Sequence, residues 1–97
     1  MNFEWDEKKR LKNVKKHGID FVDAEQVFQG FIMTVEDDRF EYGEIRYSTL
    51  GHLREWVVKV IHTPRGDTTR IISIRRANAR ERESFYDRLG QTRGYDG

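Results

Sequence analysis

The stretch Arg70-Ile71-Ile72-Ser73-Ile74-Arg75-Arg76 has the composition of a buried β-strand with three arginines on it. Its isoleucines favour a strand, but burying a guanidinium group without a partner costs several kcal/mol. The arginines are therefore expected either to pair with carboxylates or to bind an anionic ligand. Because a guanidinium group matches phosphate oxygens two at a time, the leading anionic ligand is a phosphodiester.

Alternation with a period of two predicts three further strands upstream of this one. They cover residues 31–35, 44–50 and 55–63, and the arginine-bearing strand becomes the fourth, over residues 67–76. Pro64-Arg65-Gly66 predicts a compact hairpin, and Gly51-His52-Leu53-Arg54 predicts the turn before it. Connections this short make the last three strands antiparallel neighbours.

Capping patterns predict three helices. The first runs from Asp6 to about Lys16, the second from Asp20 to Gly30, and the third from Asn78 to Leu89. The order is therefore ααββββα, an α+β fold with two N-terminal helices, a four-stranded mainly antiparallel sheet and a C-terminal helix. We predict a single domain over residues 1–89 and a mobile tail over residues 90–97.

The composition restricts the class of protein. The 97 residues allow one modest core, and 18 basic against 17 acidic residues give a net charge of only +1. Nucleic-acid affinity would therefore require segregated charge. The chain has no cysteine, no His-Glu-x-x-His spacing, no apolar run of the roughly 20 residues that span a bilayer, and no signal peptide. A cytoplasmic protein without metal, cofactor or membrane contact is expected.

Regular alternation would place Arg70, Ile72, Ile74 and Arg76 on one face of the strand, and Ile71, Ser73 and Arg75 on the other. Arg70 and Arg75 could then hold one phosphate only if a bulge, a twist or the strand end brought them together. Ion pairing is the alternative for all three arginines, and Arg76 is expected close to Glu81. The possible partners are Glu44, Glu55, Asp67 and Glu81.

Several other side chains are candidates for a site. His62 could be a general base because its unperturbed pKa lies near 6.5, although a single histidine at the end of a strand is more often a half-buried packing residue. Glu44 and Arg46 lie on the least apolar predicted strand face. The first helix carries a basic surface that includes Lys12 and Lys16, and this surface is either simply solvated or a contact for RNA or an acidic partner.

Several linked motifs resemble the BrnT family over residues 3–86. They are Phe3-Glu4-Trp5-Asp6, Lys16-His17-Gly18-Ile19-Asp20-Phe21, Asp37-Asp38-Arg39, Gly43-Glu44-Ile45-Arg46, the strand Arg70–Arg76 with Ala77, and Glu81-Arg82-Glu83. Ile74 stands where a small residue is expected. The resemblance implies a toxin of a type II toxin–antitoxin pair, with a RelE-like fold and a ribonuclease activity that inhibits translation. It also implies a BrnA-type antitoxin with a DNA-binding domain, through which alone the complex would contact operator DNA.

Metal-free RNA cleavage needs cations that stabilise charge on phosphate oxygens, together with an acid and a base. We assign phosphate binding to Arg70 and Arg75, with Arg46 as a third cation, and acid or base roles to His62 or Glu44. Lys59, Arg76, Lys12 and Lys16 are the further RNA-binding candidates. The alternative is a non-catalytic module with the same fold that binds RNA or an acidic antitoxin segment.

Overall fold

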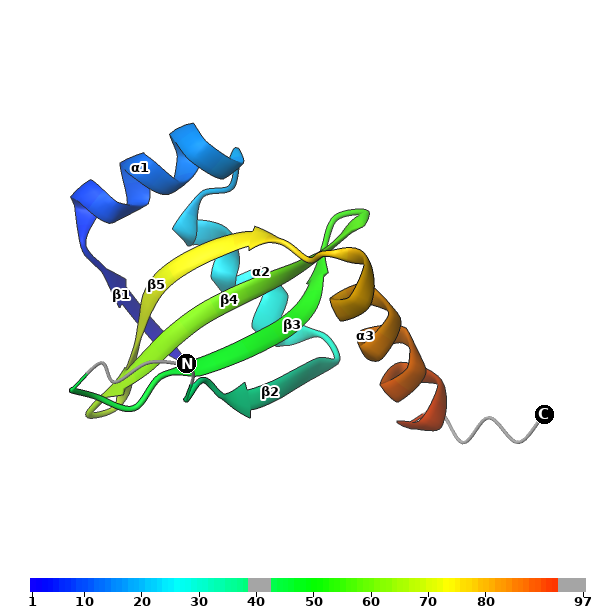
Figure 1. Cartoon of the computed structure of the whole chain (residues 1–97). Coiled ribbons are helices and arrows are strands. Elements are labelled where there is room, and N and C mark those ends of the chain that lie inside the picture. Colours follow the sequence, from blue (N-terminus) through cyan, green and yellow to red (C-terminus); the bar gives the residue numbers. More distant parts are fainter. Residues whose placement is uncertain (39–42, 93–97) are drawn as a thin grey trace.

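A computed structural model describes residues 1–38 and 43–92 of the chain. Five strands form one mixed sheet in the order β1-β5-β4-β3-β2, in which β1 is parallel to β5 and all other neighbours are antiparallel. Figure 1 shows α2 behind this sheet and α3 projecting from one end. The elements in chain order are β1 (Asn2–Trp5), α1 (Glu7–His17), the 3-10 helix η1 (Phe21–Asp23), α2 (Ala24–Gln29), β2 (Ile32–Glu36), β3 (Tyr47–Leu53), β4 (Trp56–Arg65), β5 (Thr68–Arg76) and α3 (Ala79–Thr92).

The predicted four-stranded ααββββα fold is wrong, because a strand precedes the first helix. β1 pairs in parallel with β5, from Asn2 opposite Thr68 to Trp5 opposite Ile71. A four-residue strand whose partner lies so far along the chain leaves no hairpin signal in the sequence. The predicted second helix is also shorter than expected, since it consists of η1 followed by the six-residue α2.

Both predicted turns are displaced. β3 continues through Gly51 to Leu53, and the chain turns at Arg54, whose φ is 56°. Gly51 serves close packing rather than a turn, because a Cβ there would lie 2.8 Å from Val27 Cγ1. Pro64 lies within β4, and the hairpin turns at Gly66, whose φ is 60°. The predicted tail begins within α3, which continues to Thr92, and residues 93–97 of that tail lie outside the described part.

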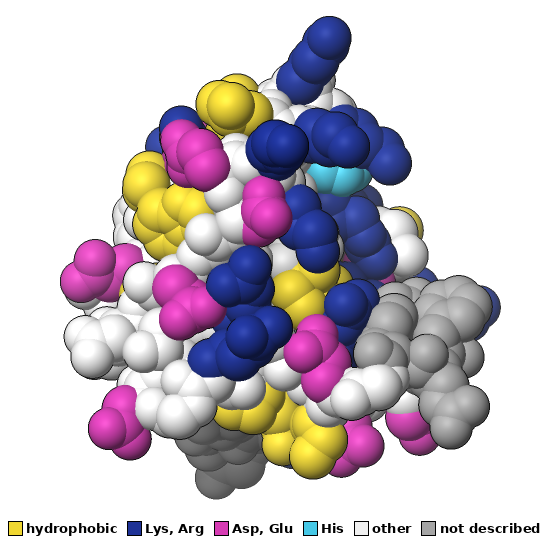
Figure 2. All heavy atoms as spheres, turned by 90° about the vertical axis from the view of Figure 1, so that its left-hand side faces the viewer, with side chains coloured by type: hydrophobic (Ala, Val, Ile, Leu, Met, Phe, Trp, Pro, Cys, Tyr) yellow, Lys and Arg dark blue, Asp and Glu magenta, His cyan; other side chains and the backbone are white. Residues whose placement is uncertain are grey.

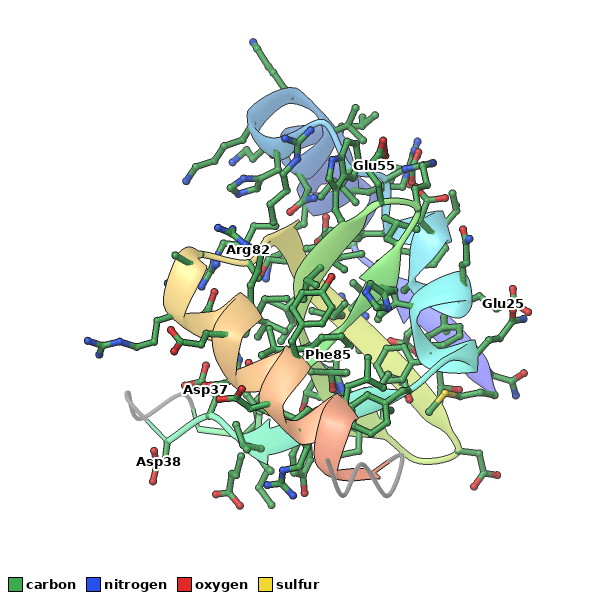
Figure 3. All side chains as sticks on the ribbon, turned by 90° about the vertical axis from the view of Figure 1, so that its right-hand side faces the viewer. Glu25, Asp37, Asp38, Glu55, Arg82 and Phe85 are labelled. Carbon is green, nitrogen blue, oxygen red and sulfur yellow. The ribbon has the colours of Figure 1, made fainter. Side chains whose placement is uncertain are left out.

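The sheet has two differently covered faces. On the first, called here the helix-covered face, Val58, Val60, Ile71 and Ile74 are buried with residues of η1 and α2. On the opposite face, called the open face, α3 covers one end through a smaller cluster. Phe85 lies in that cluster and points from α3 toward the sheet (Figure 3).

A β-bulge in β5 decides which arginines share a face. Ile61 pairs with Ser73 and His62 pairs with Ile71, so Ile72 has no opposite residue on β4. The pairing partners of Arg70 and Arg75 are Thr63 and Lys59, which are four residues apart and therefore on the same side of β4. The predicted grouping of Arg70 with Ile72, Ile74 and Arg76 is therefore wrong, and Arg70 and Arg75 both lie on the open face.

A buried asparagine of α1 holds this helix against the edge of β5. β1 covers that edge only as far as Ile71. Beyond it, Asn13 Nδ2 donates to the Ile74 carbonyl at 2.9 Å, and the Ile74 N–H donates to Asn13 Oδ1 at 3.1 Å. The same amide donates to the Ile19 carbonyl at 2.8 Å. The side chain of Asn13 thus replaces the hydrogen bonds of a neighbouring strand and fixes α1 beside β5.

Candidate functional site

Lys59, Arg75 and Glu81 form a compact ionic group on the open face, called here the Glu81 cluster. Arg75 donates from Nη1 and Nη2 to the two oxygens of Glu81, both at 2.9 Å, and Lys59 Nζ lies 3.2 Å from Glu81 Oε2. The Lys59 and Glu81 side chains are only 13% and 19% exposed. The arginine–carboxylate pair has the bidentate geometry that fixes both groups in place.

The start of α3 positions the carboxylate. The Glu81 N–H donates to Asn78 Oδ1 at 2.8 Å and the Asn78 N–H donates to Glu81 Oε1 at 2.9 Å, which is a capping box. Burial acts to raise the pKa of Glu81, but hydrogen bonds from Arg75, the Asn78 N–H and Lys59 outweigh it and lower the pKa to about 2. Glu81 is therefore ionised, and two cations against one carboxylate leave the cluster with one net positive charge.

Arg75 and Lys59 keep N–H groups that could bind a further anion. Of the five guanidinium N–H groups of Arg75, two are used by Glu81 and one by the Arg76 carbonyl at 3.0 Å. Lys59 uses one of its three N–H groups on Glu81. The side chain of Arg75 is 35% exposed. A phosphate can therefore approach the cluster without breaking the pair.

A second group of cations lies toward the β4–β5 hairpin. Arg70 Nη1 is 2.6 Å from Glu4 Oε2, and Arg46 and Arg65 lie 3.4 and 3.8 Å from the carboxylate of Glu44. Arg70 pairs opposite Thr63, four residues along β4 from Lys59, which corresponds to about 13 Å. The structure therefore brings Arg70 and Arg75 to one face but holds each beside its own carboxylate.

His62 lies on the helix-covered face, away from Arg70 and Arg75. It is 8% exposed, its Nε2 is 2.7 Å from Thr49 Oγ1, and its ring packs edge-on against Phe28. Burial lowers the pKa of His62 to about 4. This histidine is therefore a neutral packing residue near pH 7.

Arg76 also lies on the helix-covered face. Its Cζ stacks over the ring of Trp56 at 3.9 Å from the ring centre, in a cation–π contact. The expected pairing of Arg76 with Glu81 is wrong, because Arg75 occupies that carboxylate.

One hollow lies beside α1 and another lies beside the Glu81 cluster. A groove of about 270 Å³ runs between α1 and β5 and is lined by Lys9, Lys12, Asn13, Lys16, His17, Ile72 and Ser73. A hollow of about 230 Å³ lies between α3 and the sheet and is lined by Met33, Val35, Ser48, Leu50, Lys59, Arg80, Glu81 and Ser84. Figure 2 views the molecule from the left-hand side of Figure 1. Lys and Arg side chains extend from the top of this view, where α1 lies, down across the surface, with carboxylates beside them.

Two carboxylates of the site, Glu81 and Glu4, hold the arginines in place. The sequence motifs do not mark either of them as a site residue. Asn78-x-x-Glu81 indicates a helix start, but the same side chain also binds two cations. Glu4 lies opposite Arg70 only because β1 is a strand. Among the described residues, no three histidine, aspartate or glutamate side chains are grouped so that they could hold a metal ion.

These features define a small α+β protein that presents lysine and arginine side chains, each beside a carboxylate, on one open face of a mixed sheet. The chain matches the family model described as ribonuclease toxin, BrnT, of type II toxin–antitoxin system, over residues 5–81. It therefore belongs to the BrnT family of ribonuclease toxins, which confirms the resemblance seen in its motifs. A search of curated proteins finds no match. Within the described residues, no helix has the length and apolar character to cross a membrane.

Proposed function

We propose that this protein cleaves RNA without a metal ion, at a phosphodiester bound by the Glu81 cluster. The observation that carries this proposal is the bulge at Ile72, which puts Arg70 and Arg75 on one open face, with Lys59 opposite Arg75. Cleavage would inhibit translation. An antitoxin of the BrnA type, with a DNA-binding domain, would neutralise the toxin and repress the operon as a complex.

In this mechanism, Arg75 and Lys59 bind the non-bridging oxygens of the scissile phosphate and stabilise the charge that builds on them. Lys59 also protonates the leaving 5′-oxygen. Glu81 holds both cations in place and is a positioning residue. Removing one such donor typically lowers the rate on the order of 10²–10³-fold.

The other cations extend the path of the RNA. Arg70 and Arg46 bind phosphates farther along the strand, toward the hairpin, and Glu44 orients Arg46. Lys12 and Lys16 bind phosphates along the groove beside α1. We give His62 and Arg76 no direct role, because both lie on the helix-covered face.

Cleavage of RNA in EDTA tests the proposal. Wild type, Arg75→Ala and Arg70→Ala are compared with Arg54→Ala, a control at the β3–β4 turn whose side chain lies 3.3 Å from Asp23. We expect the Arg75 variant to lose about 10²-fold or more in rate, the Arg70 variant to lose affinity first, and the control to match wild type. Full activity in both folded variants would refute the assignment.

Growth separates the toxin from the non-catalytic alternative. The toxin should arrest growth when it is expressed alone, and the neighbouring gene product should rescue growth. A protein that binds RNA, leaves it intact and does not arrest growth would instead be a binding module.

A further inference from the structure

We propose that His17 is the general base of the cleavage reaction, placed beside Arg75 at the end of the groove between α1 and β5. This inference rests on the proposed function and adds the group that removes the proton from the attacking 2′-hydroxyl. The carboxylate of the Glu81 cluster does not fit that role. Glu81 itself is engaged by two cations.

The path of α1 along β5 determines where His17 lies. α1 begins just after Trp5, which pairs with Ile71, and Asn13 is hydrogen-bonded to Ile74. From Glu7 to Asn13 the helix rises about 9 Å, and from Ile71 to Ile74 the strand rises about 10 Å, so the two elements advance together. His17 follows Asn13 by four residues and therefore lies on the same side of the helix, one turn farther along. This position is level with Arg75 and Arg76.

The surroundings of His17 suit a phosphodiester. His17 is half-buried and lines the 270 Å³ groove together with Lys9, Lys12 and Lys16, which are spaced along one side of α1. Ser73 lines the opposite wall and shares its sheet face with Arg75, because both pair with alternate residues of β4. A strand bound by these lysines would bring one of its sugars to His17 and the next phosphate to Arg75.

Burial and the nearby cations favour the neutral form of His17. Burial, followed by the nearby charges of Lys16 and Arg75, lowers the pKa of His17 below its usual 6.5. The charges that act on His17 are Lys16 from α1 and Arg75 from β5. Lys9 and Lys12 line the same groove, and Glu81 from α3 pairs with Arg75. A neutral imidazole can accept a proton at pH 7, and a bound phosphate would offset the cations and stabilise the protonated form.

Two protons move in the cleavage step. An imidazole nitrogen of His17 takes the proton of the 2′-hydroxyl, and the 2′-oxygen forms a bond to phosphorus. The bond between phosphorus and the 5′-oxygen breaks, and the 5′-oxygen takes a proton from the Lys59 ammonium group. The products are a 2′,3′-cyclic phosphate and a free 5′-hydroxyl. Solvent then removes the proton from His17 and returns one to Lys59.

Single-turnover cleavage in EDTA, measured against pH, tests the inference. His17→Gln is compared with wild type and with His52→Gln, a control histidine on β3 whose Nε2 lies 3.2 Å from the Tyr86 hydroxyl. We expect His17→Gln to lose at least about 10²-fold in rate and to lose the acidic limb of the pH–rate profile. Its affinity for a 2′-O-methyl RNA, which cannot be cleaved, should match that of wild type.

A second variant excludes a merely structural role. A histidine in the last turn of a helix also stabilises the helix through its dipole when it is protonated, and loss of that effect would lower stability without changing the chemistry. His17→Ala should therefore regain activity when imidazole is added, whereas a folding defect would not respond. The inference is overturned if His17→Gln keeps the wild-type rate and pH profile, or if its RNA binding and cleavage fall in parallel. Cleavage that depends on Arg75 but not on His17 would overturn this inference alone, whereas a wild type that leaves RNA intact refutes both proposals.

Discussion

Glu81→Gln should make the folded protein less stable at neutral pH and less sensitive to acid. The pKa of Glu81 falls from 4.5 to about 2, because the hydrogen bonds from Arg75, the Asn78 N–H and Lys59 outweigh the opposing effect of burial. That difference sets a ceiling of roughly 3 kcal/mol on the stabilisation of the charged form. Arg75 is 35% exposed, so solvent screening reduces the expected loss to about 1–2 kcal/mol.

The pH dependence follows from the direction of the shift. A carboxyl group whose pKa is lowered by folding stabilises the folded state fully above pH 4.5, and this stabilisation is lost as the pH falls toward 2. Below pH 2 both states are protonated and the contribution disappears. The difference in the free energy of unfolding between wild type and Glu81→Gln should therefore shrink between pH 4.5 and pH 2.

Urea unfolding followed by circular dichroism, at several pH values across this range, measures the difference. Glu83→Gln, an exposed position on the same helix, is the matched control and should show no such pH-dependent gap. A gap between wild type and Glu81→Gln that stays constant from pH 7 to pH 2 would refute the reasoning. So would the absence of any gap at pH 7.

Three further predictions concern stability. Gly51→Ala should cost about 1–3 kcal/mol in thermal unfolding, because its Cβ would lie 2.8 Å from Val27 Cγ1, and Val27→Ala in the same chain should recover part of that loss. Asn13→Ala should speed hydrogen exchange at the Ile74 amide and cost roughly 3 kcal/mol, because buried backbone groups lose their partners; an unchanged exchange rate would contradict this. Burial lowers the pKa of His62 to about 4, so wild type should lose stability as the pH falls from 6.5 to 4. Chemical denaturation should show that the free energy of unfolding of His62→Gln depends less on pH over this range.

The regular parts of the fold follow from local patterns. Alternation and capping locate α1, α3 and four of the strands to within a few residues, because these signals lie within each segment. Local patterns do not reveal β1, because its partner strand β5 is far away in the sequence. The turn predicted at Gly51 is wrong, because the sequence alone does not distinguish a glycine needed for close contact with Val27 from one needed for a turn.

The candidate site depends on the β-bulge at Ile72, which regular alternation does not predict. The arginines of β5 were identified from residue type alone, but the bulge at Ile72 reverses the grouping of Arg70 relative to Arg75. Nothing in the isoleucine-rich segment marks the position of that bulge. The pairing of Arg75 rather than Arg76 with Glu81 then depends on where α3 begins relative to the sheet, which is a tertiary property.

The parallel pairing of β1 with β5 has a consequence for how the protein is made. Arg75 and Glu81, which are only six residues apart, lie late in the sequence. Glu4 meets Arg70 across 66 residues. Contacts between such distant residues form slowly, because a long loop must close before they contribute. During synthesis, the open face cannot be complete until the ribosome has made β5 and the start of α3. A partial product would carry the lysines of α1 without the arginines that the proposed chemistry needs, so unfinished copies of this toxin should be harmless to the ribosome that makes them.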